Sequence, residues 1–176
     1  MNERHRREPD PYWTEDHELG TIRLGRASQR VHIRSHEGRE RYGGRGSETA
    51  FALSTPGERT YLQSRLYFFA PPESRREQRL ADGQAWYYPS AAAIVLWELV
   101  PASPWWQPGE DPREDFLLRT LWLAYEGFLT ARFPQAARML TTWEDQFGRE
   151  EWQGFLTTLG YQQTAPAGFT KAIARL

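Results

Sequence analysis

The sequence predicts a single α/β domain in which helices flank a mixed β-sheet, preceded by a flexible N-terminal tail. Its 176 residues are the usual size of one domain, and a chain of this length buries roughly 70% of its unfolded surface. Eight Trp, eight Tyr and nine Phe within a hydrophobic content of 39% indicate a core rich in aromatic side chains. From residue 84 onward, apolar runs of strand length alternate with segments of helical periodicity, which is typical of α/β layers.

We place the tail at residues 1–19 and the domain at residues 20–176. The tail is polar, contains two Pro and shows no periodicity, so we expect it to be ordered only when something binds it. Residues 21–34 alternate apolar and polar side chains, which predicts a β-hairpin with one face toward water. The apolar residues of this hairpin are Ile22, Leu24, Val31 and Ile33.

A loop and two helices are expected in the middle of the chain. The glycine content of residues 37–48 predicts a flexible loop. Residues 55–58, Thr-Pro-Gly-Glu, have the pattern of a capping box with Pro at the first helical position, which predicts a helix as far as Phe69. Two Pro follow, and the charged segment 73–83 predicts a short helix that ends at Gly83.

The remainder of the chain carries the clearest elements. Residues 84–100 form two β-prone runs divided by a Pro-Ser pair, and the second run is apolar apart from Glu98, as expected of a central strand with both faces covered. Asp111, followed by Pro and then Glu, predicts the start of a helix that ends at Phe133. A short strand, a helix capped by Gly160 and two short strands are expected to follow.

The composition excludes several classes of function. A formal net charge of −1 excludes a bulk electrostatic attraction to nucleic acid or to an anionic membrane. The absence of Cys excludes disulfides, thiolate metal sites and a cysteine nucleophile. No apolar run reaches the roughly 20 residues that a membrane helix needs, so we expect a cytoplasmic protein with no membrane association.

The chain is arginine-rich as well as tryptophan-rich. Of its 22 basic residues, only Lys171 is a lysine. This bias reflects either codon usage, with Arg stems covering apolar surface, or the recognition of phosphate or carboxylate groups by Arg.

Two local patterns are interpreted as surface features. His32 and His36 would share one strand face about 13 Å apart, too far for one metal ion, and no further ligand is evident. The single Arg-Gly-Gly-like segment at residues 41–46 is surrounded by acidic residues, which favours a solvated loop over contact with nucleic acid. We therefore expect no metal site, and a nucleic-acid partner is not favoured.

The predicted end of the chain combines a helix, a glycine and a hairpin. Phe155, Leu159, Gly160 and Tyr161 form an aromatic-rich helix end that runs into the final two strands. Together with the long central strand, the capped helix and the strand after it, this order over residues 84–173 resembles the C-terminal half of the GNAT-type N-acetyltransferases. The resemblance implies a GNAT-like fold, acetyl-CoA as the cofactor and an amine as the acyl acceptor.

The resemblance also implies roles for individual residues. A carboxylate on the central strand often serves that family as the general base, and Glu98 holds this position; an acid in an apolar run should also have a raised pKa. The alternative is that Glu98 reaches solvent at the end of the strand or pairs with an Arg. Many relatives have a general-acid Tyr four residues before the Gly, where this chain has Leu156. Tyr161 and Tyr125 are then the possible substitutes, unless both are core or rim aromatics.

The family binds the pyrophosphate of acetyl-CoA at a loop written Q/R-x-x-G-x-G/A, where backbone N–H groups and the positive end of a helix meet the phosphates. Gln107, Gly109 and Asp111 lie in the corresponding segment, and Val100 would lie beside the pantetheine arm. Pro residues in this segment remove N–H donors, and its carboxylates repel an anionic cofactor. We therefore expect either no cofactor or acetyl-CoA held by a rebuilt loop.

Trp105 and Trp106 lie in the Pro-rich connection just before this segment. Two adjacent Trp in a loop cannot easily both point into one core, so either one offers a stacking surface to a partner or both cover the place where a cofactor would enter. Two functions follow. The altered loop and Leu156 favour a GNAT-like binding or assembly module with a protein partner; the alternative is an active acyl-CoA-dependent N-acyltransferase that acts on a small-molecule amine.

Overall fold

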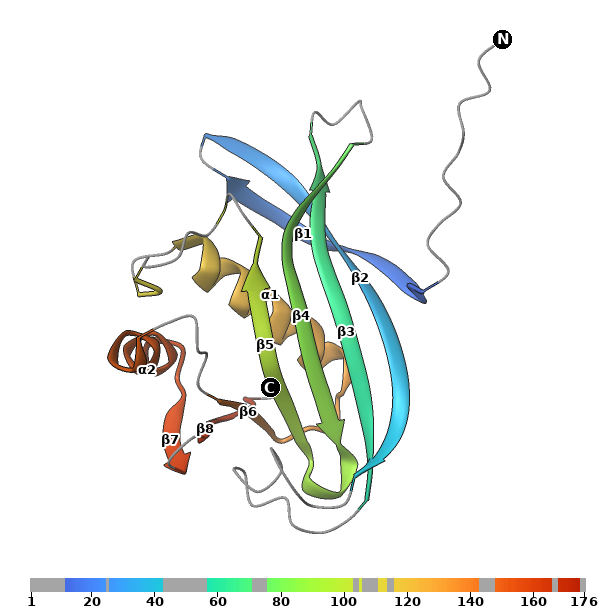
Figure 1. The fold of residues 1–176 in the computed structure, drawn as a ribbon, viewed down its shortest axis with the longest axis vertical. Coiled ribbons are helices and arrows are strands. Elements are labelled where there is room, and N and C mark those ends of the chain that lie inside the picture. Colours follow the sequence, from blue (N-terminus) through green and yellow to red (C-terminus); the bar gives the residue numbers. More distant parts are fainter. Residues whose placement is uncertain are drawn as a thin grey trace.

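The computed structural model describes residues 12–24, 26–42, 57–70, 76–102, 105, 111–113, 116–142, 148–165 and 168–174 (Figure 1). The strands are β1 (Glu15–Leu24), β2 (Ala27–Tyr42), β3 (Gly57–Phe69), β4 (Glu77–Tyr88), β5 (Ala93–Pro101), β6 (Arg138–Thr142), β7 (Gln162–Ala165) and β8 (Gly168–Ala172). The helices are α1 (Phe116–Arg132) and α2 (Arg149–Thr158), and a short 3-10 turn (Pro89–Ala91) joins β4 to β5.

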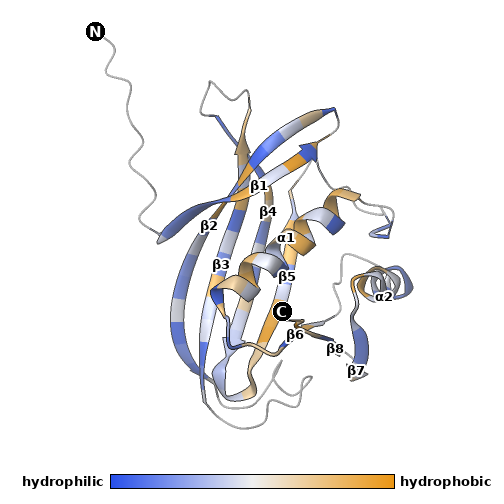
Figure 2. Cartoon of the chain, turned by 180° about the vertical axis from the view of Figure 1, so that it is seen from behind, coloured by the Kyte–Doolittle hydropathy of each residue, from blue (hydrophilic) through white to orange (hydrophobic). Residues whose placement is uncertain are grey.

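All of these strands form one sheet, in the order β1-β2-β3-β4-β5-β6-β8-β7. Neighbouring strands are antiparallel except β5 and β6, which are parallel because α1 crosses between them. The predicted α/β class and mixed sheet are therefore confirmed, and the elements from β4 to β8 occur in the predicted order. Helix α1 lies on one face of the sheet, behind β3 to β5 in Figure 1 and in front of them in Figure 2.

The core lies between α1 and the sheet. The apolar stripe predicted for α1 is buried here, and Leu121, Trp122 and Tyr125 have no exposed surface. Helix α2 packs beside α1, where the rings of Trp122 and Trp152 meet edge to face with centroids 5.4 Å apart. Full burial of one such side chain stabilises the fold by about 1.5 to 3 kcal/mol. The strands contribute Val31, Ile33, Leu62, Leu66, Leu96 and Leu99, all fully buried.

Gly83 on β4 allows α1 to approach the sheet closely. A Cβ atom at this position would lie 2.7 Å from the ring of Tyr125, closer than such atoms pack. The Tyr125 hydroxyl passes over Gly83 and donates a 3.2 Å hydrogen bond to the Ser64 hydroxyl on β3. Both of these polar groups are buried, so their hydrogen bond satisfies groups that water does not reach.

The N-terminal hairpin is confirmed, with different bounds from those expected. β1 and β2 pair antiparallel, and their apolar residues face the core. β1 begins at Glu15, so the end of the predicted tail is a strand; residues 1–11 lie outside the described part of the chain. β2 continues to Tyr42, which corrects the first half of the loop predicted at residues 37–48.

The two helices predicted before residue 84 are wrong. Residues 57–69 form β3, and residues 77–88 form β4. Leu62 and Leu66 are four residues apart, a spacing that fits both the helical period and the strand period of two, so the pattern was ambiguous. Because β3 pairs with β2 and β4 along its length, sheet pairing overrides the local capping pattern. Helix α1 begins at Phe116, not directly after Asp111.

Candidate functional site: the open face of the sheet

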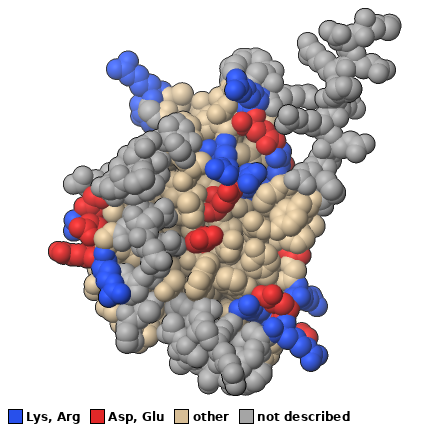
Figure 3. All heavy atoms as spheres, viewed as in Figure 1, with Lys and Arg blue, Asp and Glu red and all other residues tan. Residues whose placement is uncertain are grey.

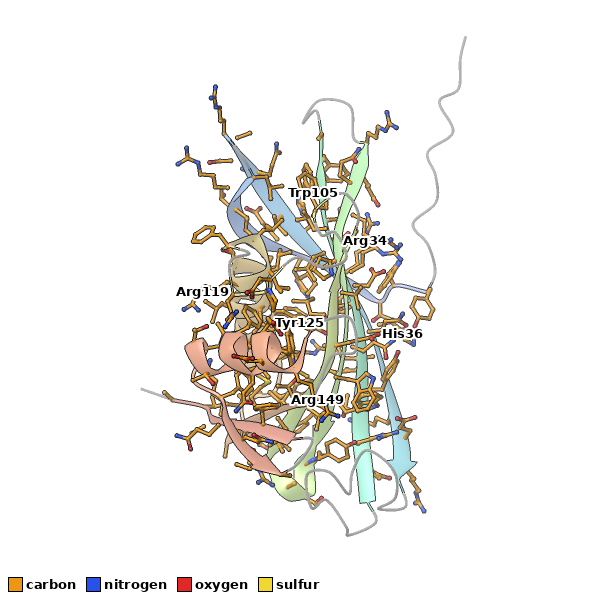
Figure 4. All side chains as sticks on the ribbon, turned by 60° about the vertical axis from the view of Figure 1, so that its left-hand side comes forward. Arg34, His36, Trp105, Arg119, Tyr125 and Arg149 are labelled. Atoms are coloured by element: carbon orange, nitrogen blue, oxygen red, sulfur yellow. The ribbon has the colours of Figure 1, made fainter. Side chains whose placement is uncertain are left out.

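The face of β2 to β5 that is turned away from α1 is called the open face. Neither described helix covers it: in Figure 4, Tyr125 lies between α1 and the strands, α2 lies on the side of α1, and His36 lies across the sheet. Gly83 is on the face of β4 that meets Tyr125 of α1. Because successive side chains of a strand point to opposite faces, the next residue, Gln84, is on the open face. The strand register continues this row from β2 to β5 through His36, Gln63, Gln84 and Glu98. Figure 3 shows this face, with charges of both signs around uncharged surface.

Arginines on the open face repeat one arrangement, in which a guanidinium bound by a carboxylate also lies over an aromatic ring. Nε of Arg34 donates to Asp16 at 2.9 Å, and its guanidinium carbon is 4.1 Å from the centre of the Tyr67 ring. Stacking and ion pairing reinforce each other in this geometry. The same arrangement is formed by Arg59 with Glu40 and Trp86, and by Arg65 with Asp82 and Trp13.

Glu98 is the exception to this arrangement. Every other acidic residue in the described strands forms an ion pair with an arginine. The half-buried Glu98 forms no ion pair or hydrogen bond with any residue in the described part of the chain. The amide of Gln84, opposite it on β4, and the indole of Trp97, next to it on β5, also have no such partner among the described residues. Three adjacent polar groups therefore have no partner within the described part of the chain.

Aromatic side chains border Glu98. The Trp86 ring lies 5.5 Å from that of Trp97, nearly perpendicular to it, and 5.8 Å from that of Tyr61. Trp97 is the extra residue where the pairing of β4 and β5 shifts register, and such bulges redirect side chains. Burial raises the pKa of Tyr61, and the nearby Tyr12, Glu40 and Glu98 raise it further. The charges of Glu40 and Glu98 on the open face therefore act on the Tyr61 hydroxyl.

The segment that leads into β1 crosses the same face. The Tyr12 ring stacks on the His36 ring with centroids 4.3 Å apart, and its hydroxyl donates to the side-chain oxygen of Gln63. Nδ1 of His36 donates to the backbone carbonyl of Tyr12 at 2.8 Å. His32 instead packs against Tyr67. Within the described residues, no group of three His, Asp or Glu side chains is placed to hold a metal ion.

Tyr161, the predicted proton donor, is buried away from Glu98 in a cluster on the α1 side of the sheet. Its hydroxyl donates to Oε1 of Glu126 at 2.6 Å, and the Trp122 indole donates to the same oxygen at 2.9 Å. Lys171 on β8 donates to Oε2 of Glu126 at 2.8 Å. Burial and the charge of Glu126 raise the pKa of Tyr161 well above its usual range. The structure therefore does not bring Tyr161 and Glu98 to one site.

The residues predicted to hold a cofactor are only partly described. Asp111 accepts hydrogen bonds from the backbone and the side chain of Arg113, which hold its pKa below the usual range. Val100 lies on the open face, two residues after Glu98 and opposite Asp82. Gln107 and Gly109 lie outside the described residues.

Trp105, one of the two residues predicted to bind a partner, packs against the domain. Its indole donates to the backbone carbonyl of Arg79 at 3.1 Å, and its ring meets that of Phe68. It is partly buried at the edge of the core. Trp106 lies outside the described residues, so its role stays a prediction.

Glu98 is predicted from the sequence, but most of the side chains around it are not. The predicted helix over residues 55–69 contains Tyr61, and the sequence pattern assigns no role to Gln84, Trp86 or Trp97. For Tyr61, Gln84 and Trp86, alternation with the buried residues of β3 and β4 is the signal that places them on one face. Trp97 is the extra residue of a bulge, so alternation alone would place it on the face opposite to Glu98. That signal is useful only once both segments are recognised as strands.

Comparison with models of known protein families gives no match for this sequence, and no curated protein sequence matches it. The function proposed below is therefore argued from the fold, from the open face and from the resemblance described above. None of the helices in the described part of the chain is both long and apolar enough to cross a membrane.

Proposed function

We propose that this protein is a GNAT-like domain that acts as a binding or assembly module, with the open face around Glu98 as its recognition surface. The other acidic groups of the described strands are paired with arginines. The observation that carries the proposal is that the polar groups of the half-buried Glu98, Gln84 and Trp97 have no ion-pair or hydrogen-bond partner among the described residues. A protein gains little from such groups for its own stability. They are well suited to contacts with another molecule.

The proposed partner is a protein. The open face combines half-buried Tyr and Trp side chains with a surround of Arg and acidic groups, and protein interfaces are enriched in Tyr, Trp and Arg. The arginines described on this face are neutralised by carboxylates, so they offer no unpaired positive surface to a nucleic acid. An assembly role uses these side chains without any bound cofactor.

Two features argue against regular acetyl-CoA binding. The proline at position 112 has no N–H donor, and the Asp111 carboxylate precedes α1 where the resemblance places the pyrophosphate, so it would repel an anion. The Tyr161 hydroxyl is committed to Glu126 in a buried cluster, where it is not available to protonate a leaving thiolate. Both features are consistent with loss of the transferase chemistry.

One observation favours the alternative, an active acyl-CoA-dependent N-acyltransferase. The parallel pairing of β5 and β6 ends at Val95 and Leu140, whereas β5 runs on to Pro101. The edge of β5 at residues 96–101 is therefore left without a β6 partner, beside the residues where the resemblance places a pantetheine arm. In that case Glu98 would act as the general base toward an amine.

Titration with acetyl-CoA separates the two functions. We expect isothermal titration calorimetry to show no saturable heat up to millimolar cofactor, and backbone NMR signals of Leu99 and Val100 to stay unchanged. Micromolar binding, with shifts at these two residues, would establish the acyltransferase alternative and contradict the binding module.

A further inference from the structure

We propose that Glu98 binds a guanidinium group supplied from outside the domain, the side chain of an arginine in the protein partner. This inference rests on the proposed function, because it names the chemical group that the open face recognises. It does not require Glu98 to act on a substrate.

The argument begins with the repeated arrangement on the open face. Each of three carboxylates, Asp16, Glu40 and Asp82, receives an arginine whose guanidinium also lies over an aromatic ring. Glu98 has the carboxylate and the neighbouring aromatic rings, but no arginine in the described part of the chain. The component that is missing is a cation with a flat face. Charge complementarity therefore selects a guanidinium as the occupant.

The surroundings of Glu98 suit this group. Trp97 precedes it on β5, and the Tyr61 hydroxyl lies within the electrostatic reach of its carboxylate. The side-chain oxygen of Gln84 offers a second acceptor across the strand pair. A guanidinium has five N–H donors in one plane, so it can bind a carboxylate through two of them, reach an amide oxygen and still stack on a ring.

A lysine fits this position less well. Its ammonium is a compact, strongly hydrated point charge that neither stacks on a ring nor binds a carboxylate through two parallel donors. Glu98 is half-buried, so a cation that binds there gives up part of its hydration, and the weakly hydrated guanidinium loses less. Within the described strands, arginines supply the cations that pair with the acidic groups.

The probe is N-acetyl-arginine methylamide, compared with its lysine and citrulline counterparts. Citrulline keeps the shape and removes the charge, which isolates the ion pair from stacking. Binding is followed in ¹H–¹⁵N NMR spectra through the indole N–H signals of Trp86 and Trp97. Glu98→Gln is the test variant, and Glu18→Gln is the matched control, because Glu18 is a strand carboxylate that already pairs with Arg30.

We expect the arginine probe to shift both indole signals in a saturable way, the lysine probe to bind more weakly and the citrulline probe to have no effect. Glu98→Gln should weaken binding about tenfold, the change expected from losing one charge-assisted contact, and Glu18→Gln should not change it. Equal binding to Glu98→Gln, equal binding of citrulline, or no shift with arginine would each overturn the proposal. If neither the arginine probe nor acetyl-CoA binds, the proposal of a guanidinium ligand is wrong and the binding module is not contradicted. Micromolar binding of acetyl-CoA would contradict the binding module itself.

Discussion

The two faces of the sheet use the same residue types in opposite ways. On the covered face, Glu126 lies among Trp122, Tyr161 and Lys171, and these three side chains donate hydrogen bonds to its carboxylate. On the open face, Glu98 also lies beside aromatic rings, but no described residue donates to it. A glutamate among tryptophans is therefore not by itself a functional residue. What distinguishes the two is whether the fold has already satisfied the carboxylate.

The difference has a structural cause. Glu126 on α1 meets Tyr161, which follows α2, and Lys171 on β8, so its cluster ties α1 to the C-terminal part of the chain. Glu98 projects from β5 toward a face that no described helix covers, and its nearest cross-strand neighbour is Gln84. Burial without partners would be costly for either carboxylate. On the covered face, protein donors satisfy the Glu126 carboxylate. On the open face, no donor among the described residues satisfies the Glu98 carboxylate.

The largest expected effect separates these two carboxylates. Glu126→Ala leaves the partly exposed Lys171 ammonium and the buried Trp122 and Tyr161 donors without their acceptor. The free energy of unfolding should fall by about 1 to 3 kcal/mol for each of the buried donors. Glu98→Ala removes no ion pair or hydrogen bond among the described residues and should change the free energy of unfolding by less than about 0.5 kcal/mol. Urea denaturation of both variants measures the difference. Equal losses would show that the two glutamates have the same structural role.

A second pair of variants compares the packing of the two faces. Gly83→Ala places a methyl group against the Tyr125 ring and should cost about 1 to 3 kcal/mol through overpacking. Gly38→Ala on β2 places the same methyl group where no atom lies within 4 Å, and should be neutral or slightly stabilising. Thermal unfolding of the two variants tests this. A destabilised Gly38→Ala protein would mean that the open face is covered at β2.

Alkaline pH should weaken the covered face. Tyr161 has a raised pKa in the folded protein because of burial and then the charge of Glu126, so above about pH 10 the folded state holds a proton that the unfolded state has lost. The contribution of Tyr161 to the free energy of unfolding is complete below the pKa that it has in the unfolded chain. It is lost as the pH rises toward its pKa in the folded protein, by about 1.4 kcal/mol per pH unit. Tyr161→Phe removes this dependence. The urea midpoints of the unmodified protein and of Tyr161→Phe should therefore approach each other between about pH 8 and about pH 11. A constant difference between the two proteins across this range would contradict the raised pKa of Tyr161.

How much the sequence could predict differs between the halves of the chain. From residue 84 onward, long apolar runs and Gly160, which has φ of +91°, give consistent local information, and the order of elements is predicted. Before residue 84, Leu62 and Leu66 fitted two periods at once, and only pairing with β2 and β4 decides between them. Glu98 could be selected as a lone acid in an apolar strand. Its lack of a partner among the described residues cannot be predicted from the sequence, because it depends on where the arginines of other strands lie.

The smallest expected effect compares two carboxylates within the open face. Asp82→Asn weakens ion pairs with Arg65 and Arg79, which are partly exposed, so it should lower the free energy of unfolding by up to about 1 kcal/mol and less at high salt. Glu98→Gln removes a charge that no described arginine neutralises, so the change should be close to zero and independent of salt. The measurement is urea denaturation at low and high ionic strength. If Glu98→Gln lost as much stability as Asp82→Asn, with the same salt dependence, Glu98 would already be paired within the protein, and the site for an external arginine would not exist.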